Sequence, residues 1–206
     1  MEVVTKLLTR IKVTVKYNSS RLLTYNFAVS GAVVDDAIFP SRTPSMRVQI
    51  EDRFLPEYGN ESHPWDSSNS LFAAFFGIND INASYRSRNS SINSLIISSY
   101  SSFIEDLYQT GARNFLFLNV PAVHRSPLTM NSNESSTIVE LQRKAITDFN
   151  LKIRNMATSL VERHKDATAF VFDTFTLFNE VLDDPSSHDE TAVYRNTTDF
   201  CQAYAR

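Results

Sequence analysis

Apolar residues occur along the chain in two patterns: short continuous runs, and longer stretches in which they recur every three or four residues. Short runs bounded by glycine, proline or polar residues are typical of buried strands, whereas the wider spacing is typical of helices with one apolar face. Runs of the first kind predict strands at 21–29, 70–76, 114–120 and 168–172. The segments between these runs are then available for helices.

Helical spacing is found in three of the intervening segments. The first predicted helix covers 43–55, and the second begins at Ile92 and ends before Gly111, where glycine is a common C-cap residue. The third and longest covers 137–165. The apolar stripes comprise Met46, Ile50 and Phe54 in the first helix, Ile92, Leu95, Ile96, Tyr100, Phe103 and Leu107 in the second, and Ile138, Leu141, Ile146, Phe149, Ile153, Met156 and Leu160 in the third.

Alternating strands and helices predict an α/β fold, a three-layer α/β/α sandwich with a parallel sheet and a flavodoxin-like arrangement. In such sheets the crossovers are right-handed and ligands bind at the carboxyl ends of the strands. Gly31 follows the first predicted strand, and Gly77 and Asn79 follow the second. Glycine permits a sharp turn and an asparagine amide can donate a hydrogen bond, so these residues are candidates for a site at that edge.

Composition limits the classes of partner. With 206 residues, 42% hydrophobic and 21% charged, the chain is expected to form one globular domain over residues 1–206. A net charge of -3, without any block of lysine and arginine, argues against nucleic acid as a partner. No apolar stretch approaches the roughly 20 residues of a membrane-spanning helix, so we expect no membrane partner either.

The first residues, "MEVVTKLLTRIKVTVKYNSS", lack the continuous apolar core of a signal peptide. Within 1–16 a strand and a helix both remain open, because "IKVTVKY" alternates and "VVTKLLTRI" has helical spacing. Cys201 is the only cysteine, which excludes an internal disulfide and a multi-cysteine metal site. Glycan acceptor sequences, which also arise by chance in a chain rich in Asn, Ser and Thr, occur at Asn18, Asn60, Asn82, Asn89, Asn133 and Asn196.

Several segments resemble the SGNH, or GDSL-type, hydrolases. "NFAVSGA" at 26–32 and "GIND" at 77–80 resemble the second and third sequence blocks of that family. The stretches "GARNFLFLNVPAVHRSP", "FDTFTLFNEVLDDP" and "NTTDFCQAY" resemble fungal members of carbohydrate esterase family sixteen, which are secreted acetylesterases. The resemblance covers the chain from about residue 18 onward. It implies an acetylated carbohydrate or small ester as substrate, an extracellular location and no cofactor.

The same resemblance assigns two residues to an oxyanion hole, the set of donors that stabilises the negatively charged intermediate of ester cleavage. Gly31 would donate through its backbone N–H and Asn79 through its side-chain amide. A plain turn is the alternative for Gly31, and a helix cap is the alternative for Asn79. Asp80 is expected to cap or brace the turn rather than to act as an acid or base.

The nucleophile and the base of the family have no counterpart in the sequence. It contains no Gly-Asp-Ser, and His63, His124, His164 and His188 all lack an aspartate three residues before them. We therefore expect a chain truncated at both ends, without the first strand and the final Asp-x-x-His segment of the family, and inactive as an esterase. A noncatalytic glycan-binding or interaction remnant is the alternative. A nucleotide-binding protein is disfavoured, because no glycine-rich phosphate loop is present.

Other polar residues near predicted strand ends have simpler interpretations. Ser30 lies beside an oxyanion donor and not at a nucleophile position, His124 is expected on a surface loop, and Asp173 is expected to cap a helix. Metal binding is not expected, because the acidic residues Asp183, Asp184, Asp189 and Glu190 lack ligand spacing and form a solvated loop. Loss of an inner strand would expose a sheet edge and apolar surface, which predicts marginal stability and self-association.

Overall fold

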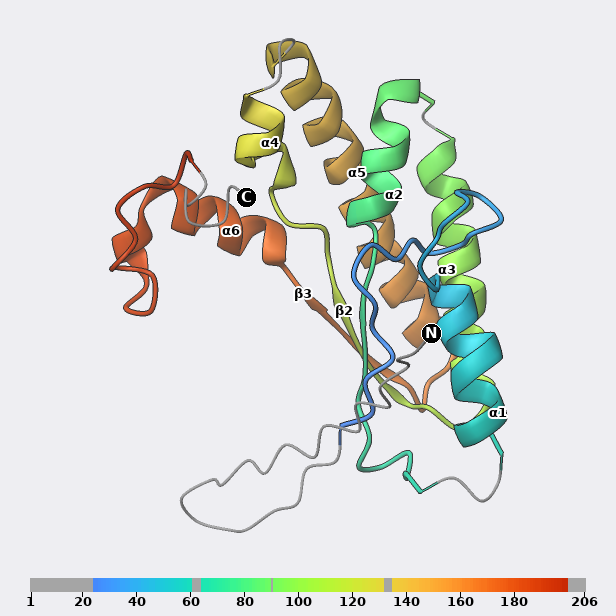
Figure 1. Cartoon of the computed structure of the whole chain (residues 1–206). Coiled ribbons are helices and arrows are strands. Elements are labelled where there is room, and N and C mark those ends of the chain that lie inside the picture. Colours follow the sequence, from blue (N-terminus) through green and yellow to red (C-terminus); the bar gives the residue numbers. More distant parts are fainter. Residues whose placement is uncertain (1–23, 61–63, 90, 132–134, 200–206) are drawn as a thin grey trace, which may run out of the picture.

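The computed structural model describes residues 24–60, 64–89, 91–131 and 135–199. Its centre is a three-stranded parallel sheet with the order β1-β2-β3 (Figure 1). The strands are β1 (Phe72–Phe75), β2 (Asn114–Leu118) and β3 (Thr168–Phe172). Each strand lies within one of the predicted runs, so the α/β class with a parallel sheet is confirmed.

Two long helices connect these strands. The connection from β1 to β2 contains α2 (Ile78–Ser84) and α3 (Ile92–Gln109), and the connection from β2 to β3 contains α4 (Pro127–Met130) and α5 (Ser135–Arg163). Right-handed crossovers between parallel strands that follow one another across a sheet place their helices on the same face. Accordingly, α3 and α5 pack against each other over one side of the sheet (Figure 1).

Shorter helices surround this unit. The predicted helix at 43–55 is present as two consecutive segments, and the first of them is wound more widely than an α-helix. A further helix leads away from the carboxyl end of β3 (Figure 1). The remaining segments are η1 (Val48–Phe54), α1 (Leu55–Tyr58), η2 (Tyr85–Ser87), η3 (Val123–Arg125), α6 (Thr174–Asp183) and η4 (Pro185–Ser187).

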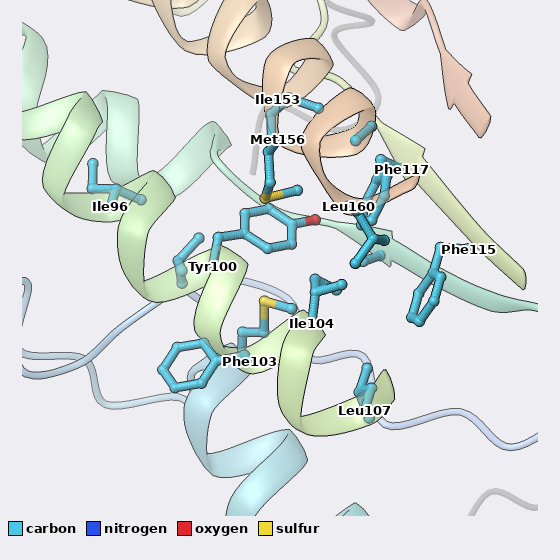
Figure 2. Packing of buried hydrophobic residues seen from close by; sticks show 14 of the residues in the cluster. Ile96, Tyr100, Phe103, Ile104, Leu107, Phe115, Phe117, Ile153, Met156 and Leu160 are labelled. Atoms are coloured by element: carbon cyan, nitrogen blue, oxygen red, sulfur yellow. The ribbon is translucent and has the colours of Figure 1, made fainter. Parts of the chain in front are cut away.

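The core lies between the sheet and the two long helices. Alternate residues of β2, Phe115 and Phe117, are completely buried on this side. The ring of Tyr100 from α3 lies 6.1 Å from that of Phe117, and Figure 2 shows it beside Met156 and Leu160 of α5. Burying one large apolar side chain contributes about 1.5–3 kcal/mol, so the packing of this layer stabilises the fold.

The opposite face of the sheet is apolar and open. Phe75, Leu118 and Phe172 form one row across the three strands, because they are partners in the parallel register. Phe75 retains 47% of its exposure, Phe172 48% and, in the neighbouring row, Phe170 57%. The described residues therefore supply two of the three expected layers.

The prediction of a strand at 21–29 is wrong for its described part. Residues 24–29 form no strand, and among the described residues β1 pairs only with β2. The segment is in contact with η1 and α1 through its aromatic side chains. The ring of Phe27 lies 5.9 Å from that of Phe54 and 5.9 Å from that of Tyr58.

Some expectations fall on residues outside the described ranges: the conformation of 1–16, and the positions of Asn18, His63, Asn133 and Cys201. Among the helices that the structure describes, none combines the length and the apolar character needed to cross a membrane.

Candidate oxyanion site

The site begins at the carboxyl end of β1, where the chain turns at Gly77 into α2. Gly77 has a φ of 114°, which L side chains rarely adopt. A Cβ atom at this position would lie 2.4 Å from Cε1 of Phe149 and 2.7 Å from Cγ2 of Val120. Both the conformation and the space therefore require glycine, and the turn places Asn79 and Asp80 in the first turn of α2.

Asn79 points toward the segment that contains Gly31. Its Nδ2 donates a hydrogen bond of 2.8 Å to the carbonyl oxygen of Ala32, the residue that follows Gly31. An amide nitrogen carries two hydrogens, and Ala32 occupies one of them. Asn79 therefore contacts the neighbour of Gly31 in sequence, although Asn79 and Gly31 are 48 positions apart in the chain.

Gly31 occupies an exposed turn. Its φ of 84° favours glycine, but space does not demand it, because the nearest atom to an added Cβ would be Oγ1 of Thr43 at 3.6 Å. The turn is closed by a hydrogen bond from the Ala32 N–H to the Val29 carbonyl. Among the described residues, no partner occupies the N–H of Gly31.

Asp80 holds the segment that follows Gly31 by a second hydrogen bond, at Val34. Its carboxylate is fully buried, and Oδ1 accepts a hydrogen bond of 3.0 Å from the N–H of Val34. Burial raises the pKa of Asp80 to about 6, although the backbone N–H groups of Val34 and Gly77 act in the opposite direction. Asp80 therefore braces the turn, as expected.

The brace extends to the next helix. The carbonyl of Val33 accepts from the N–H of Met46, and that of Val34 accepts from the N–H of Arg47. The Arg47 side chain in turn donates from Nε and Nη2 to the two oxygens of Asp36, both at 2.9 Å. Hydrogen bonds from Arg47 and Ser45 lower the pKa of Asp36 to about 2. The turn is thus fixed between two helices.

His124 lies in η3, beyond the carboxyl end of β2, and its expected place on the surface is wrong. It is only 5% exposed, because Phe175 from α6 stacks on its ring at 5.7 Å. Burial lowers the pKa of His124, and its Nδ1 is buried without a hydrogen-bond partner among the described residues. A triad base needs a carboxylate at that nitrogen, so the arrangement does not make His124 a base.

A histidine with a carboxylate partner lies near the amino ends of the strands, opposite the candidate site. Nε2 of His164 is 2.9 Å from Oε2 of Glu105, and the His164 ring stacks on Tyr108 at 3.7 Å. His164 and Glu105 lie at the carboxyl ends of α5 and α3, which precede the amino ends of β3 and β2. This pair therefore joins the two helices and is remote from Asn79.

A polar link at the carboxyl ends of β2 and β3 was not predicted. Asn119 donates from Nδ2 to Oδ1 of Asp173 at 2.8 Å, and its own Oδ1 accepts from the Thr174 hydroxyl at 2.8 Å. Asp173 also accepts from the N–H of Thr176 and so caps α6, as expected. Burial opposes the ionisation of Asp173, but the hydrogen bonds from Asn119 and Thr176 lower its pKa.

No cluster of three or more metal-ligating side chains occurs in the part of the chain that the structure describes. The candidate site consists of the two proposed hydrogen-bond donors, Gly31 and Asn79, and the carboxylates that hold the 31–36 segment. Donors held in place before a ligand arrives are the kind of group that stabilises a negatively charged oxygen.

Comparison with known proteins adds the family. The family model described as GDSL-like Lipase/Acylhydrolase matches residues 3–205. An acetylesterase of Thermothelomyces thermophilus is 29% identical over 182 residues, which cover 84% of this chain and 59% of that protein. A GDSL esterase/lipase of Arabidopsis thaliana is 29% identical over 113 residues, which cover 54% of this chain and 30% of the relative. The chain thus spans about three fifths of the acetylesterase. On the family match, this chain belongs to the GDSL-like lipases and acylhydrolases.

Proposed function

We propose that this chain carries the oxyanion-stabilising part of an ester hydrolase site and does not hydrolyse esters by itself. The observation that supports the first half is the hydrogen bond from Asn79 to Ala32, which fixes the asparagine amide at the residue that follows Gly31. The N–H of Gly31 has no partner among the described residues. Membership in the GDSL-like lipase and acylhydrolase family supports ester chemistry at this place.

The two donors suit the chemistry of acyl transfer. When a serine oxygen attacks an ester carbonyl, the carbonyl oxygen takes up negative charge, and loss of the alcohol then leaves an acyl-enzyme that water hydrolyses. A donor aimed at that oxygen is worth roughly 3–4 kcal/mol of transition-state stabilisation. Gly31 and Asn79 would act at this step, and neither would transfer a proton.

The proposal that the chain does not hydrolyse esters by itself rests on the nucleophile and the base that the reaction would need. The 206-residue sequence contains neither Gly-Asp-Ser nor an aspartate three residues before a histidine. His124, which lies beyond the end of β2, has no carboxylate at its buried Nδ1 among the described residues. Removing the nucleophile from a triad enzyme costs about a millionfold in rate, so turnover by this chain should be too slow to detect in an ordinary esterase assay.

The substrate class is proposed from resemblance. The relative from Thermothelomyces thermophilus is named an acetylesterase, which supports an acetyl ester as the acyl group. The likeness to family-sixteen carbohydrate esterases supports a carbohydrate as the alcohol, an extracellular location and glycosylation. We propose no cofactor for this chemistry.

Hydrolysis of 4-nitrophenyl acetate by the purified chain tests inactivity, with a buffer blank and the variant Asn79→Ala beside it. We expect no turnover above the blank. Turnover that persists in Asn79→Ala would contradict both the inactivity and the role of Asn79. A titration with sodium acetate, followed by NMR, tests the donors directly: the Gly31 and Asn79 side-chain amide signals should shift saturably. The control Asn155→Ala, on the exposed side of α5, should leave those shifts unchanged.

A noncatalytic binding remnant is the second candidate, and the open apolar face of the sheet favours it. This face could bind another polypeptide. We propose that two copies of the chain associate through this face and the neighbouring edge of β1. The genomic sequence on both sides of the reading frame distinguishes the candidates. Exons that encode Gly-Asp-Ser upstream and Asp-x-x-His downstream would favour the esterase, and their absence would favour the remnant.

A further inference from the structure

We propose that Asp80 is a positioning residue of the oxyanion site, whose carboxylate holds the Val34 amide and thereby fixes the turn that presents Gly31 beside Asn79. This inference rests on the proposed function, because it assigns a task to Asp80 only if Gly31 and Asn79 are the donors. In this proposal Asp80 accepts a hydrogen bond and orients the turn, whereas Gly31 and Asn79 would contact a ligand.

The first support is the geometry of two consecutive residues. Asn79 donates to the carbonyl of Ala32 at 2.8 Å, and Asp80 accepts from the N–H of Val34 at 3.0 Å. The first turn of α2 thus grips the 31–34 segment at one carbonyl and one N–H, on either side of Val33. A segment held at two such points cannot rotate about its own axis without losing one hydrogen bond.

The second support is the burial of the acceptor. Asp80 and Val34 are both completely buried, so water cannot replace the hydrogen bond between them. A carboxylate accepts a stronger hydrogen bond than a neutral acid does. The strength of the hold on the turn should therefore depend on the charge of Asp80.

The surroundings of Asp80 contain two other titratable groups among the described residues. Asp35, at the end of the same turn, repels a charge on Asp80 and helps to raise its pKa. Tyr100 of α3 is completely buried, and burial together with the Asp80 charge raises the pKa of its hydroxyl, so it stays neutral. The Oδ2 atom of Asp80 and the Tyr100 hydroxyl are both buried without a hydrogen-bond partner among the described residues.

Amide NMR and hydrogen exchange on the full chain, without ligand, test the proposal. In the wild type, the Gly31 amide and the Asn79 side-chain amide should titrate together with a midpoint near pH 6, the pKa of Asp80. At pH 7, Asp80→Ala should raise the exchange rate of the Val34 amide about tenfold, which corresponds to the loss of one hydrogen bond to a charged acceptor. Asp80→Asn keeps a neutral side-chain oxygen, so it should restore part of the protection while abolishing the titration.

Asp173→Asn is the matched control, because Asp173 also follows a strand and lies at a helix N-terminus. It should leave the titration of Gly31 and Asn79 intact. A midpoint near pH 6 that survives in Asp80→Asn would belong to another group and would overturn the proposal, as would unchanged Val34 exchange in Asp80→Ala. If Asp80→Ala does not fold, the wild-type titration and Asp80→Asn still decide. Failure of the donors themselves would appear in the acetate titration, independently of these results.

Discussion

At the scale of single residues, the GIND tetrapeptide combines a conformational demand with two polar tasks. Gly77 turns the chain, Asn79 reaches Ala32 and Asp80 reaches Val34. The sequence blocks at 26–32 and 77–80 identify Gly31 and Asn79 as candidates. It cannot show that Gly77 lies against Phe149, because that contact joins residues far apart in the chain.

A comparison of two glycines with similar φ values distinguishes the cost of backbone strain from the cost of steric overlap. Gly77 and Gly111 have φ values of 114° and 103°, but an added Cβ would lie 2.4 Å from Phe149 at the first and no closer than 3.8 Å to Trp65 at the second. Gly111→Ala should cost about 1–2 kcal/mol of unfolding free energy from strain alone. Gly77→Ala should cost about 1–3 kcal/mol more, from overpacking. Urea unfolding measures both losses, and equal losses of unfolding free energy in Gly77→Ala and Gly111→Ala would contradict the steric overlap at Gly77.

The charge of Asp80 should lower global stability while it holds the turn. Its pKa rises from 3.8 to about 6 on folding, so the native state binds the proton more tightly than the unfolded chain. The stability contributed by this proton is fully present below about pH 4 and is lost as the pH rises through 6, with a total of about 3 kcal/mol.

Asp80→Asn removes this dependence. The variant should therefore gain about 2–3 kcal/mol of stability relative to the wild type as the pH rises from 4 to 7. The cost of a buried amide without a partner is the same at every pH and does not change this gain. Urea unfolding of both proteins at several pH values measures the difference. A difference that is constant with pH would show that the carboxylate is not buried in solution.

At the scale of elements, the pattern of apolar residues predicted the position of an element correctly where that element packs against the core between the sheet and the long helices. The prediction for β3 agrees with the observed Thr168–Phe172, and α5 differs by two residues at each end from the predicted 137–165. The predicted strand at 21–29 fails over its described residues, because a strand depends on a neighbour that its own sequence cannot specify. The burial of His124 was missed for a similar reason, since it depends on Phe175 in α6.

The Asn119 link between β2 and α6 is a testable element-scale feature. Asn119→Ala removes the acceptor of Thr174 and Phe175 and the donor to Asp173, so we expect a loss of about 2–3 kcal/mol and faster hydrogen exchange over α6. Asn155→Ala, at an exposed position of α5, is the same substitution and should stay within about 0.5 kcal/mol of the wild type. Unchanged exchange in α6 would show that the link does not hold this helix.

At the scale of the whole molecule, the dominant feature is the sheet face that no described element covers. Both long crossovers place their helices on one side, and the aromatic rows on the other side stay open. The sequence predicted exposed apolar surface, but it could not say which face, since that follows from the strand order and the handedness of the connections.

Self-association should follow from this face. Phe170→Thr removes an exposed ring and keeps a residue that suits strands, so it should shift the wild-type mass distribution toward monomer in sedimentation velocity. Leu128→Thr removes an 87% exposed residue on α4, away from the sheet, and should leave the distribution unchanged. A wild type that is monomeric at all concentrations and melts cooperatively above about 60 °C would contradict both the association and the marginal stability.

The open aromatic rows also bear on how this protein can be assayed. Dyes such as ANS fluoresce on exposed apolar surface and usually report a loosened state. Here the native sheet presents such a surface, with Phe170 at 57% exposure. Dye-based thermal scans should therefore start bright and fall on heating, and a sample that is correctly folded would be mistaken for a molten one unless near-ultraviolet circular dichroism is recorded beside it.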